Sequence, residues 1–335
     1  MLYSSLLQSA NVQYLIKMNT AKYILNIGLL VSGAVSAPAV EITLFATGVD
    51  PSDPATYYNN RQEYTPTCWA ASGSNVIAHW QDHNAPKTDG AAISPWGVEA
   101  PQGEQVYWTY RSFYNTYQGG WATTLFRYWL GYHHAGGLRG YNPVMNSEGV
   151  YLLDTPIGNG GFYQSYYDSK EDVMAIAWKW SDTTDMTSDT RYTTDLSRAI
   201  YQALSAGNAV VLDIKGHLHA ITLWGVTFDT DTNLITKAWV TDSSSSTFRR
   251  AGMNEVLVKE NNGKLVMDGD YYYGITASDQ WVNRITIDEA HFLGINSAET
   301  LSFIRSGIAI PEPAAFGLFA GLFALTSVSI RRRRN

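Results

Sequence analysis

Cysteine is almost absent from this chain of 335 residues, in which Cys68 is the only one. A single thiol excludes an internal disulfide, and it excludes zinc sites that are built from several cysteines. His133 and His134 are adjacent, but no Cys or carboxylate stands at ligand spacing from them. We therefore expect neither a metal nor another cofactor.

Positive charge is scarce as well. The chain has 23 Lys and Arg against 30 Asp and Glu, a formal net charge of −7. Six of the basic residues lie in the two ends of the chain, so residues 40–310 are more acidic still and contain no basic run. This charge balance argues against nucleic acid as a partner.

Long apolar runs are missing except at the two ends. Residues 1–39 contain no acidic residue, and from Met18 they read as a secretory signal, with Lys22, an apolar run over 23–35 and a small-residue cleavage site at 37–39. Residues 1–17 then precede the true start. The alternative is a buried N-terminal helix.

The other end has three parts: Pro311-Glu312-Pro313, an apolar run from Ala314 to Ile330, and four arginines at 331–334. Such a run can just span a membrane, with the arginines on the cytoplasmic side. This ending resembles the PEP-CTERM sorting signal of Gram-negative bacteria, which implies processing by an exosortase-type membrane protease. We expect an exported protein, extracellular or at the cell surface, that touches the membrane only through this segment before processing; a plain tail anchor is the alternative.

Between the ends, residues 40–310 are expected to form one domain in which helices come first and the sheet later. This order predicts an α+β fold with the helix that starts near Cys68 packed on an antiparallel sheet. The expected helices are 68–83, 104–117, 121–132 and one from Thr193 or Thr194 to Gly207-Asn208; the expected strands are 41–45, 209–214, 219–224, 226–228 and 234–240, with short strands over 247–310.

The setting of Cys68 suggests a reactive group. Thr67 is a plausible N-cap, and Trp69, Gly73, Val76, Ile77 and Trp80 follow helical spacing. Cys68 then lies in the first helical turn, where the positive end of the helix dipole favours a thiolate. The alternative is that Cys68 is a small buried hydrophobic residue.

A base and an orienting group are available downstream. His219 opens one expected strand, and Asp242 follows the return strand, so the two ends are neighbours in an antiparallel pair. The carboxylate can then orient the ring, as nucleophilic acyl transfer requires. Asp213 and Asp229 are alternatives for the carboxylate, and His217 is given no role.

The order and spacing of these residues resemble papain-type enzymes. His219 lies about 150 residues after Cys68, against roughly 130–150 in papain-type proteases, and the dipeptide Cys68-Trp69 has the papain form. Gln62 stands six positions before the cysteine, where such enzymes keep an oxyanion-hole side chain. A papain-like two-lobed cysteine protease fold is what this resemblance implies.

A closer resemblance is to the IdeS/Mac family of secreted bacterial cysteine endopeptidases. It rests on 68–80, on 196–212 and above all on 219–229 followed by 239–243, and it spans about residues 60–300. The resemblance implies that Cys68 is the nucleophile, His219 the general base and acid, and Asp242 the orienting carboxylate.

Two positions depart from that family. Its second aspartate is replaced by Ser244, which leaves at most a supporting role there. Its oxyanion-hole lysine has no counterpart, because no Lys occurs between Pro38 and Cys68. Gln62, or less favourably Arg61, has to substitute.

The sequence therefore predicts an exported papain-like cysteine endopeptidase that hydrolyses peptide bonds of an extracellular protein or peptide through Cys68, His219 and Asp242. Two alternatives stay open. One is a catalytically inactive surface or matrix binding protein that retains the fold, and the other is a Cys-dependent acyltransferase.

Overall fold

The structure is a computed structural model that describes residues 40–60, 62, 67–86, 92–94, 97, 99–113, 120–131, 160–167, 170–181, 191–214, 218–244, 252–268 and 285–306. All of them belong to one compact unit, Val40–Glu312. The predicted export and sorting segments and the pair His133-His134 lie outside the described residues. None of the helices in the described part of the chain has the length and apolar character needed to cross a bilayer.

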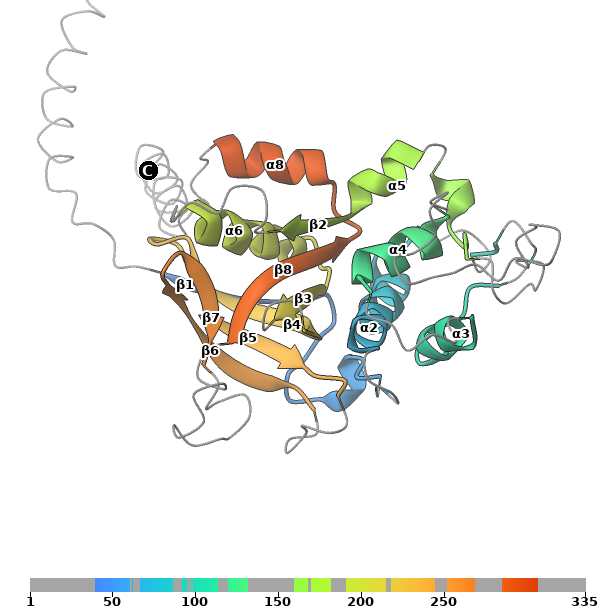
Figure 1. Ribbon diagram of the computed structural model, residues 1–335, viewed down its shortest axis with the longest axis horizontal. Helices are drawn as coiled ribbons and strands as arrows, with labels where there is room; N and C mark the ends of the chain where they lie inside the picture. The colour runs from blue at the N-terminus through green and yellow to red at the C-terminus, as the bar shows by residue number, and fades with distance from the viewer. Residues whose placement is uncertain are drawn as a thin grey trace, which may run out of the picture. The chain divides into compact units, whose positions relative to one another are not determined.

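The described part of the chain contains six α-helices, five of which have nine or more residues, and two short 3-10 helices. They are η1 (Pro54–Thr56), α2 (Cys68–His83), α3 (Gln105–Phe113), α4 (Ala122–Leu130), η2 (Gln164–Tyr166), α5 (Lys170–Ile176), α6 (Arg191–Ser205) and α8 (Ser297–Ser306). In Figure 1, α2, α3 and α4 gather on one side of the sheet strands, whereas α6 and α8 lie together near β1 and β8.

The strands are β1 (Glu41–Phe45), β2 (Ala177–Ser181), β3 (Val210–Ile214), β4 (His219–Asp229), β5 (Leu234–Thr241), β6 (Asn254–Asn261), β7 (Lys264–Met267) and β8 (Ile285–Leu293). They form one sheet in the order β1-β4-β3-β8-β7-β6-β5, with β2 on β8 and a further pairing of β4 with β5. The β4–β5 pairing closes the sheet on itself. Every pairing between these strands is antiparallel.

The cysteine helix ends and begins where the sequence predicts. Its N-cap is Thr67, and its C-cap is Asn84, two residues before Pro86. The predicted capping bond is absent, however: the Thr67 side chain makes no capping bond, and its hydroxyl lies 3.3 Å from the Tyr107 hydroxyl. The Thr67 hydroxyl therefore contacts Tyr107 and does not cap the helix, although threonine is a favoured N-cap residue.

The coarse prediction of mixed helix and antiparallel sheet, with the Cys68 helix packed on it, is confirmed. Helix α2 contacts β4, β3 and β8 on one side and α3 and α4 on the other. Fourteen of its sixteen residues are buried. A helix that is buried nearly all round lies between layers, so α2 is the central element of the core.

Three details of the prediction are wrong. The runs 219–224 and 226–228 are one strand, β4, whose register with β5 shifts between Leu223 and Gly225. Helix α6 starts at Arg191, before the predicted caps, although it ends at Ser205 and is followed by Gly207 with a φ of 83°, as expected for a glycine stop. Strand β2 was not predicted and lies between α5 and α6, so a sheet segment interrupts the helices, whereas β1 has the predicted bounds.

Candidate active site

His219 and Asp242 meet as the hairpin pairing predicts. His219 is the first residue of β4, and Asp242 directly follows β5. The antiparallel register pairs Thr222 with Thr241, which brings the start of one strand to the end of the other. His219 Nε2 lies 2.9 Å from Asp242 Oδ1. The carboxylate thus fixes the orientation of the imidazole ring.

The thiol of Cys68 reaches the same imidazole from the N-terminus of α2. A hydrogen-bonding interaction and a charge interaction with Cys68 both raise the pKa of His219, which places the thiol beside the ring. Since Nε2 faces Asp242, Nδ1 is the ring nitrogen that is left for the thiol. Three side chains from α2, β4 and the end of β5 are therefore arranged in series, thiol to imidazole to carboxylate.

The electrostatics of the site favour a charged imidazole. Burial of His219 lowers its pKa, but hydrogen bonds and negative charge from Asp242 and Cys68 outweigh that cost and raise the pKa from 6.5 to about 9. The His219 side chain is 15% exposed, and Cys68 is 7% exposed. The thiol and the ring are therefore mostly removed from solvent.

The Asp242 carboxylate also accepts a hydrogen bond from the backbone. The backbone N–H of Ser244 donates to Asp242 Oδ1 over 2.8 Å, to the same oxygen that faces His219. Asp242 is 3% exposed. A buried carboxylate that accepts two hydrogen bonds on one oxygen is fixed in place, so the position of the missing second aspartate still contributes through its main chain.

Gln62 lies beside this segment. Its backbone N–H donates to the carbonyl of Ser243 over 2.7 Å, and it forms an isolated parallel bridge with Ser244. Gln62 is 4% exposed. The residue predicted for the oxyanion hole is thus next in space to the residue that follows Asp242. Its alternative, Arg61, lies outside the described residues.

A polar stripe on α2 was missed by the sequence reasoning, which recognised only the apolar positions. Ser72, Asn75 and His79 recur at helical spacing from Cys68 and are all buried. Ser72 Oγ donates to the carbonyl of Ala220 over 3.0 Å. His79 Nε2 lies 2.9 Å from the carbonyl of Thr47. The signal in the sequence is the recurrence of these polar residues at intervals of three and four from Cys68.

Asn75 is the central residue of this stripe. Its amide nitrogen donates to Thr222 Oγ1 over 3.0 Å and to Ser243 Oγ over 3.4 Å, and its oxygen accepts from the backbone N–H of Asn60 over 2.8 Å. One side chain thereby joins the cysteine helix to β4, to the residue after Asp242 and to the segment leading to Gln62.

Trp69 is packed from two sides. Its ring meets Tyr110 edge to face, with centroids 5.4 Å apart. A Cβ placed on Gly120 would lie 2.4 Å from the Trp69 ring. The backbone at Gly120 therefore lies directly on the indole beside the thiol, and only glycine fits there without a shift.

The other two predicted carboxylate candidates are placed away from His219. Asp213 pairs with a different histidine, His291, at 3.1 Å. Asp229 stands at the opposite end of β4, where its side chain accepts from the backbone N–H groups of a turn. His217 lies outside the described residues. The carboxylate that contacts the His219 ring is Asp242.

No protein-family model matches this chain, and no curated protein matches it.

Proposed function

We propose that this protein is an exported papain-like cysteine endopeptidase, related to the IdeS/Mac type, that hydrolyses peptide bonds of an extracellular protein or peptide. The observation that carries the proposal is the series formed by the Cys68 thiol, the His219 ring and the Asp242 carboxylate. A nucleophile, a base and an orienting acid in contact are what acyl transfer to sulfur requires.

In the proposed reaction, the Cys68 sulfur attacks the scissile carbonyl carbon, and the thiol proton resides on His219. The imidazolium then donates this proton to the departing amine as the C–N bond breaks, which leaves a thioester on Cys68. His219 takes a proton from water, the hydroxide attacks the thioester, and the carboxylic acid product leaves as the thiol re-forms.

Two features support the charge flow in this scheme. The raised pKa of His219, about 9, supplies an imidazolium at neutral pH, so the general acid of the first step is present before the substrate binds. The N-terminus of α2 lies under the sulfur, where backbone N–H groups and the helix dipole favour negative charge.

Gln62 is the side chain we assign to the oxyanion. It is buried beside Ser243 and Ser244, the two residues that follow Asp242. An amide donor in an oxyanion hole contributes about 3 kcal/mol to the transition state in other proteases. In this assignment the amide replaces the lysine that the IdeS/Mac pattern uses.

The test compares the wild type, Cys68→Ala and Gln62→Ala on a peptide library and on an extracellular proteome. We expect cleavage products from the wild type, none from Cys68→Ala, and about 100-fold slower cleavage by Gln62→Ala. Equal product patterns for wild type and Cys68→Ala would reject the peptidase.

Two further measurements separate the remaining functions. The cleavage assay is repeated with and without an added amine. Products that appear only with the amine would identify an acyltransferase instead of a hydrolase. Alkylation of Cys68 by iodoacetamide at neutral pH is expected to slow strongly in His219→Ala. Equal alkylation rates in the two proteins, without cleavage by either, would point to an inactive binding protein that retains the fold.

A further inference from the structure

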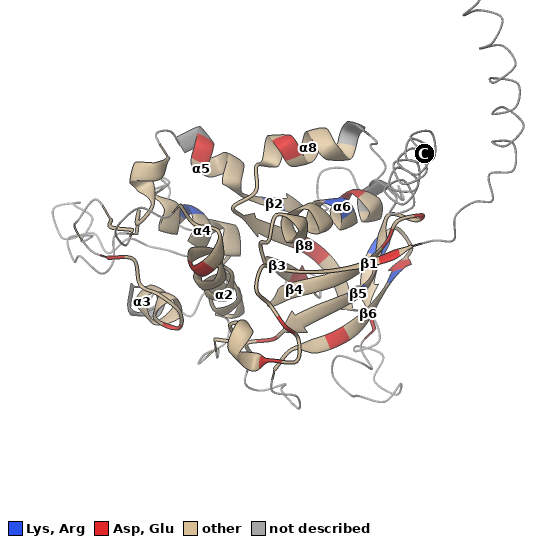
Figure 2. Cartoon of the chain, turned by 180° about the vertical axis from the view of Figure 1, so that it is seen from behind, with Lys and Arg blue, Asp and Glu red and all other residues tan. Residues whose placement is uncertain are grey.

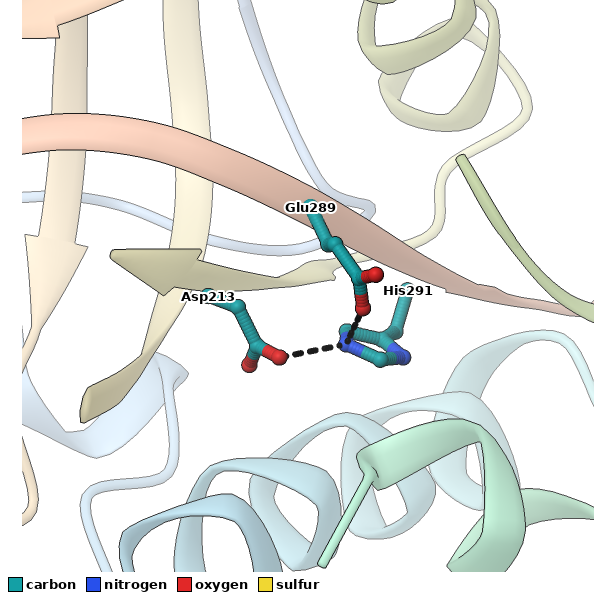
Figure 3. Close-up of side chains that lie close together, drawn as sticks. All are labelled: Asp213, Glu289 and His291. Atoms are coloured by element: carbon teal, nitrogen blue, oxygen red, sulfur yellow. Dashed lines mark ion pairs between the residues drawn. The ribbon is translucent and has the colours of Figure 1, made fainter. Parts of the chain in front are cut away.

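A second group of ionisable side chains lies on the same sheet, outside the candidate active site. Asp213 is on β3, and Glu289 and His291 are on β8. The register places Asp213 opposite Glu289, and His291 is two residues further along β8, so the three share one face of the sheet. Figure 3 shows them converging above the helices that cover that face.

All three side chains are removed from solvent. Asp213, Glu289 and His291 are 5%, 3% and 0% exposed. One ligand atom of each lies within 4.8 Å of those of the other two. Two carboxylates and an imidazole buried this closely are costly unless a positive charge compensates them.

Lys179 compensates one of the two carboxylates. Its Nζ lies 2.7 Å and 2.9 Å from the two oxygens of Glu289 and also stands over the Trp121 ring. With a neutral imidazole, the four side chains still sum to one negative charge. The group therefore needs one more positive charge, which is either a proton on His291 or a bound cation.

The imidazole is oriented for a cation. His291 Nε2 points between the two carboxylates, 3.1 Å from Asp213 Oδ2 and 3.7 Å from Glu289 Oε2. The separation from Asp213 is short but does not meet the geometry of a hydrogen bond, and within the described part of the chain this fully buried nitrogen has no hydrogen-bond partner. A buried ring nitrogen of this kind is an available ligand atom.

The opposite ring nitrogen is held from α4. His291 Nδ1 accepts from the backbone N–H of Thr123 over 3.3 Å and also contacts the Thr123 hydroxyl. Zinc on Nε2 requires the ring proton to be on Nδ1, which then donates to the Thr123 hydroxyl in place of accepting from the backbone N–H.

We propose that Asp213, Glu289 and His291 bind one Zn²⁺ ion that joins β3 to β8 inside the core. Tetrahedral zinc with bonds of about 2.0–2.2 Å spaces its ligand atoms by roughly 3.3–3.5 Å. The observed separations of 3.1 Å and 3.7 Å from His291 Nε2 bracket that spacing. The fourth ligand is a water or a second carboxylate oxygen.

The ligand set excludes the common hard cations. Calcium takes six to eight oxygens, and magnesium keeps several waters, whereas this buried group offers three side chains and one of them is a nitrogen. Imidazole with two carboxylates suits zinc. Lys179 and Thr123 then act as the outer partners that fix Glu289 and His291.

Zinc binding has to be measured apart from the active-site thiol, which can also bind zinc. The full chain carrying Cys68→Ala is freed of metal with a chelator, dialysed, and titrated with Zn²⁺. We expect one zinc per chain by elemental analysis, and a rise in Tm of about 5 °C or more at a hundredfold excess of Zn²⁺ over its Kd. The affinity should fall as the pH drops, since a proton competes for Nε2.

Asp213→Asn and Glu289→Gln in the same background should each lower the zinc affinity at least tenfold, and Thr123→Val by about 10–100-fold. The control is His79→Gln, which changes a buried histidine outside the group and should leave the affinity unchanged. Co²⁺ provides a second readout, because its visible absorption reports a tetrahedral site without a stability measurement.

A Cys68→Ala chain that gains neither zinc nor thermal stability would overturn the proposal and assign the positive charge to a proton on His291. Zinc that stays bound at full affinity in Asp213→Asn and Glu289→Gln would overturn it as well, by placing the ion elsewhere. Neither result depends on whether the protein is a peptidase.

Discussion

One sheet carries two histidine–carboxylate pairs that differ in what surrounds them. His219 lies 2.9 Å from Asp242, and His291 lies 3.1 Å from Asp213. The first pair contacts a thiol and is partly exposed, whereas the second contacts a further carboxylate and is closed to solvent. The histidine–carboxylate distance is nearly the same in both pairs. The chemistry open to each pair therefore depends on the third side chain beside it and on its exposure to solvent.

The position along the strands explains the difference in access. His219 opens β4 and Asp242 follows β5, so the first pair lies at strand ends, where the N-terminus of α2 arrives. Asp213, Glu289 and His291 lie within strands, under α4. The exposure differs accordingly, because the His219 side chain is partly exposed whereas the His291 side chain is fully buried. Figure 2 shows that acidic positions lie on β8 and β3 within the sheet as well as at its margins.

The largest expected effect comes from the same substitution in both pairs. Asp242→Asn should lower kcat/KM by about 10²–10⁴, because the amide no longer stabilises the imidazolium. Asp213→Asn should keep kcat/KM within about threefold and instead lower the free energy of unfolding by about 1–3 kcal/mol. Steady-state kinetics and urea unfolding on both variants measure this.

A loss of activity in Asp213→Asn as large as in Asp242→Asn would mean that both pairs serve one site. Circular dichroism at the assay temperature is the control, since it shows whether each variant is folded when it is assayed.

Sequence patterns could predict the first pair because its information is local. A lone cysteine at a helix start, a histidine at a strand start and an aspartate after the return strand are each visible in short segments. Antiparallel pairing of consecutive strands then brings His219 and Asp242 together without further knowledge.

The second pair was not predictable for the opposite reason. It needs β3 paired with β8, which are about 75 residues apart, and the register between them. From the sequence, Asp213 could only be named as an alternative partner of His219. Glu289 and His291 belong to no recognisable motif, so the sequence does not point to them. The closure of the sheet and the shift in register at Gly225 are long-range results of the same kind.

The second prediction concerns pH. The folded pKa of His219, about 9, lies above its unfolded value near 6.5. In the proposed reaction the imidazolium is the general acid, so kcat/KM should fall about tenfold per pH unit above pH 9. In Asp242→Asn this alkaline limb should move to lower pH, because the hydrogen bond and charge that raise the pKa are lost. An unchanged limb would show that Asp242 does not set it.

The same shift has a consequence for stability. Because the folded state binds the His219 proton more tightly, the contribution is complete below about pH 6.5, decreases between 6.5 and 9, and is lost above 9. Urea unfolding of wild type and His219→Gln at pH 6 and pH 9.5 should therefore differ most at pH 6. A difference that grows toward pH 9.5 would contradict the raised pKa.

The third prediction compares two helix side chains, Asn75 on α2 beside the first pair and Thr123 on α4 beside the second. Asn75→Ala removes the bonds from α2 to Thr222 and Ser243, and should lower kcat/KM about tenfold and the free energy of unfolding by about 1–3 kcal/mol. Thr123→Val removes the hydroxyl at His291 Nδ1 and should lower only the free energy of unfolding.

Asn75 is a positioning residue in this view, so its loss should also alter the pH dependence of Cys68 alkylation. A variant Asn75→Ala that loses stability but alkylates and cleaves like the wild type would reduce Asn75 to a structural role. Activity lost in Thr123→Val would connect α4 to the reacting groups.

The smallest expected effect is at Ser244, where the IdeS/Mac pattern has its second aspartate. The contact to Asp242 Oδ1 comes from the Ser244 backbone N–H over 2.8 Å. Ser244→Ala keeps that N–H, so kcat/KM should stay within about threefold of the wild type, while Ser244→Pro removes the donor and should cost about 10-fold or more. Ser244→Asp adds a charge near the pair and should raise the pKa of His219 further, which shifts the alkaline limb upward. If Ser244→Ala lost as much activity as Ser244→Pro, the hydroxyl and not the main chain would hold Asp242, and the two pairs would both depend on side-chain partners.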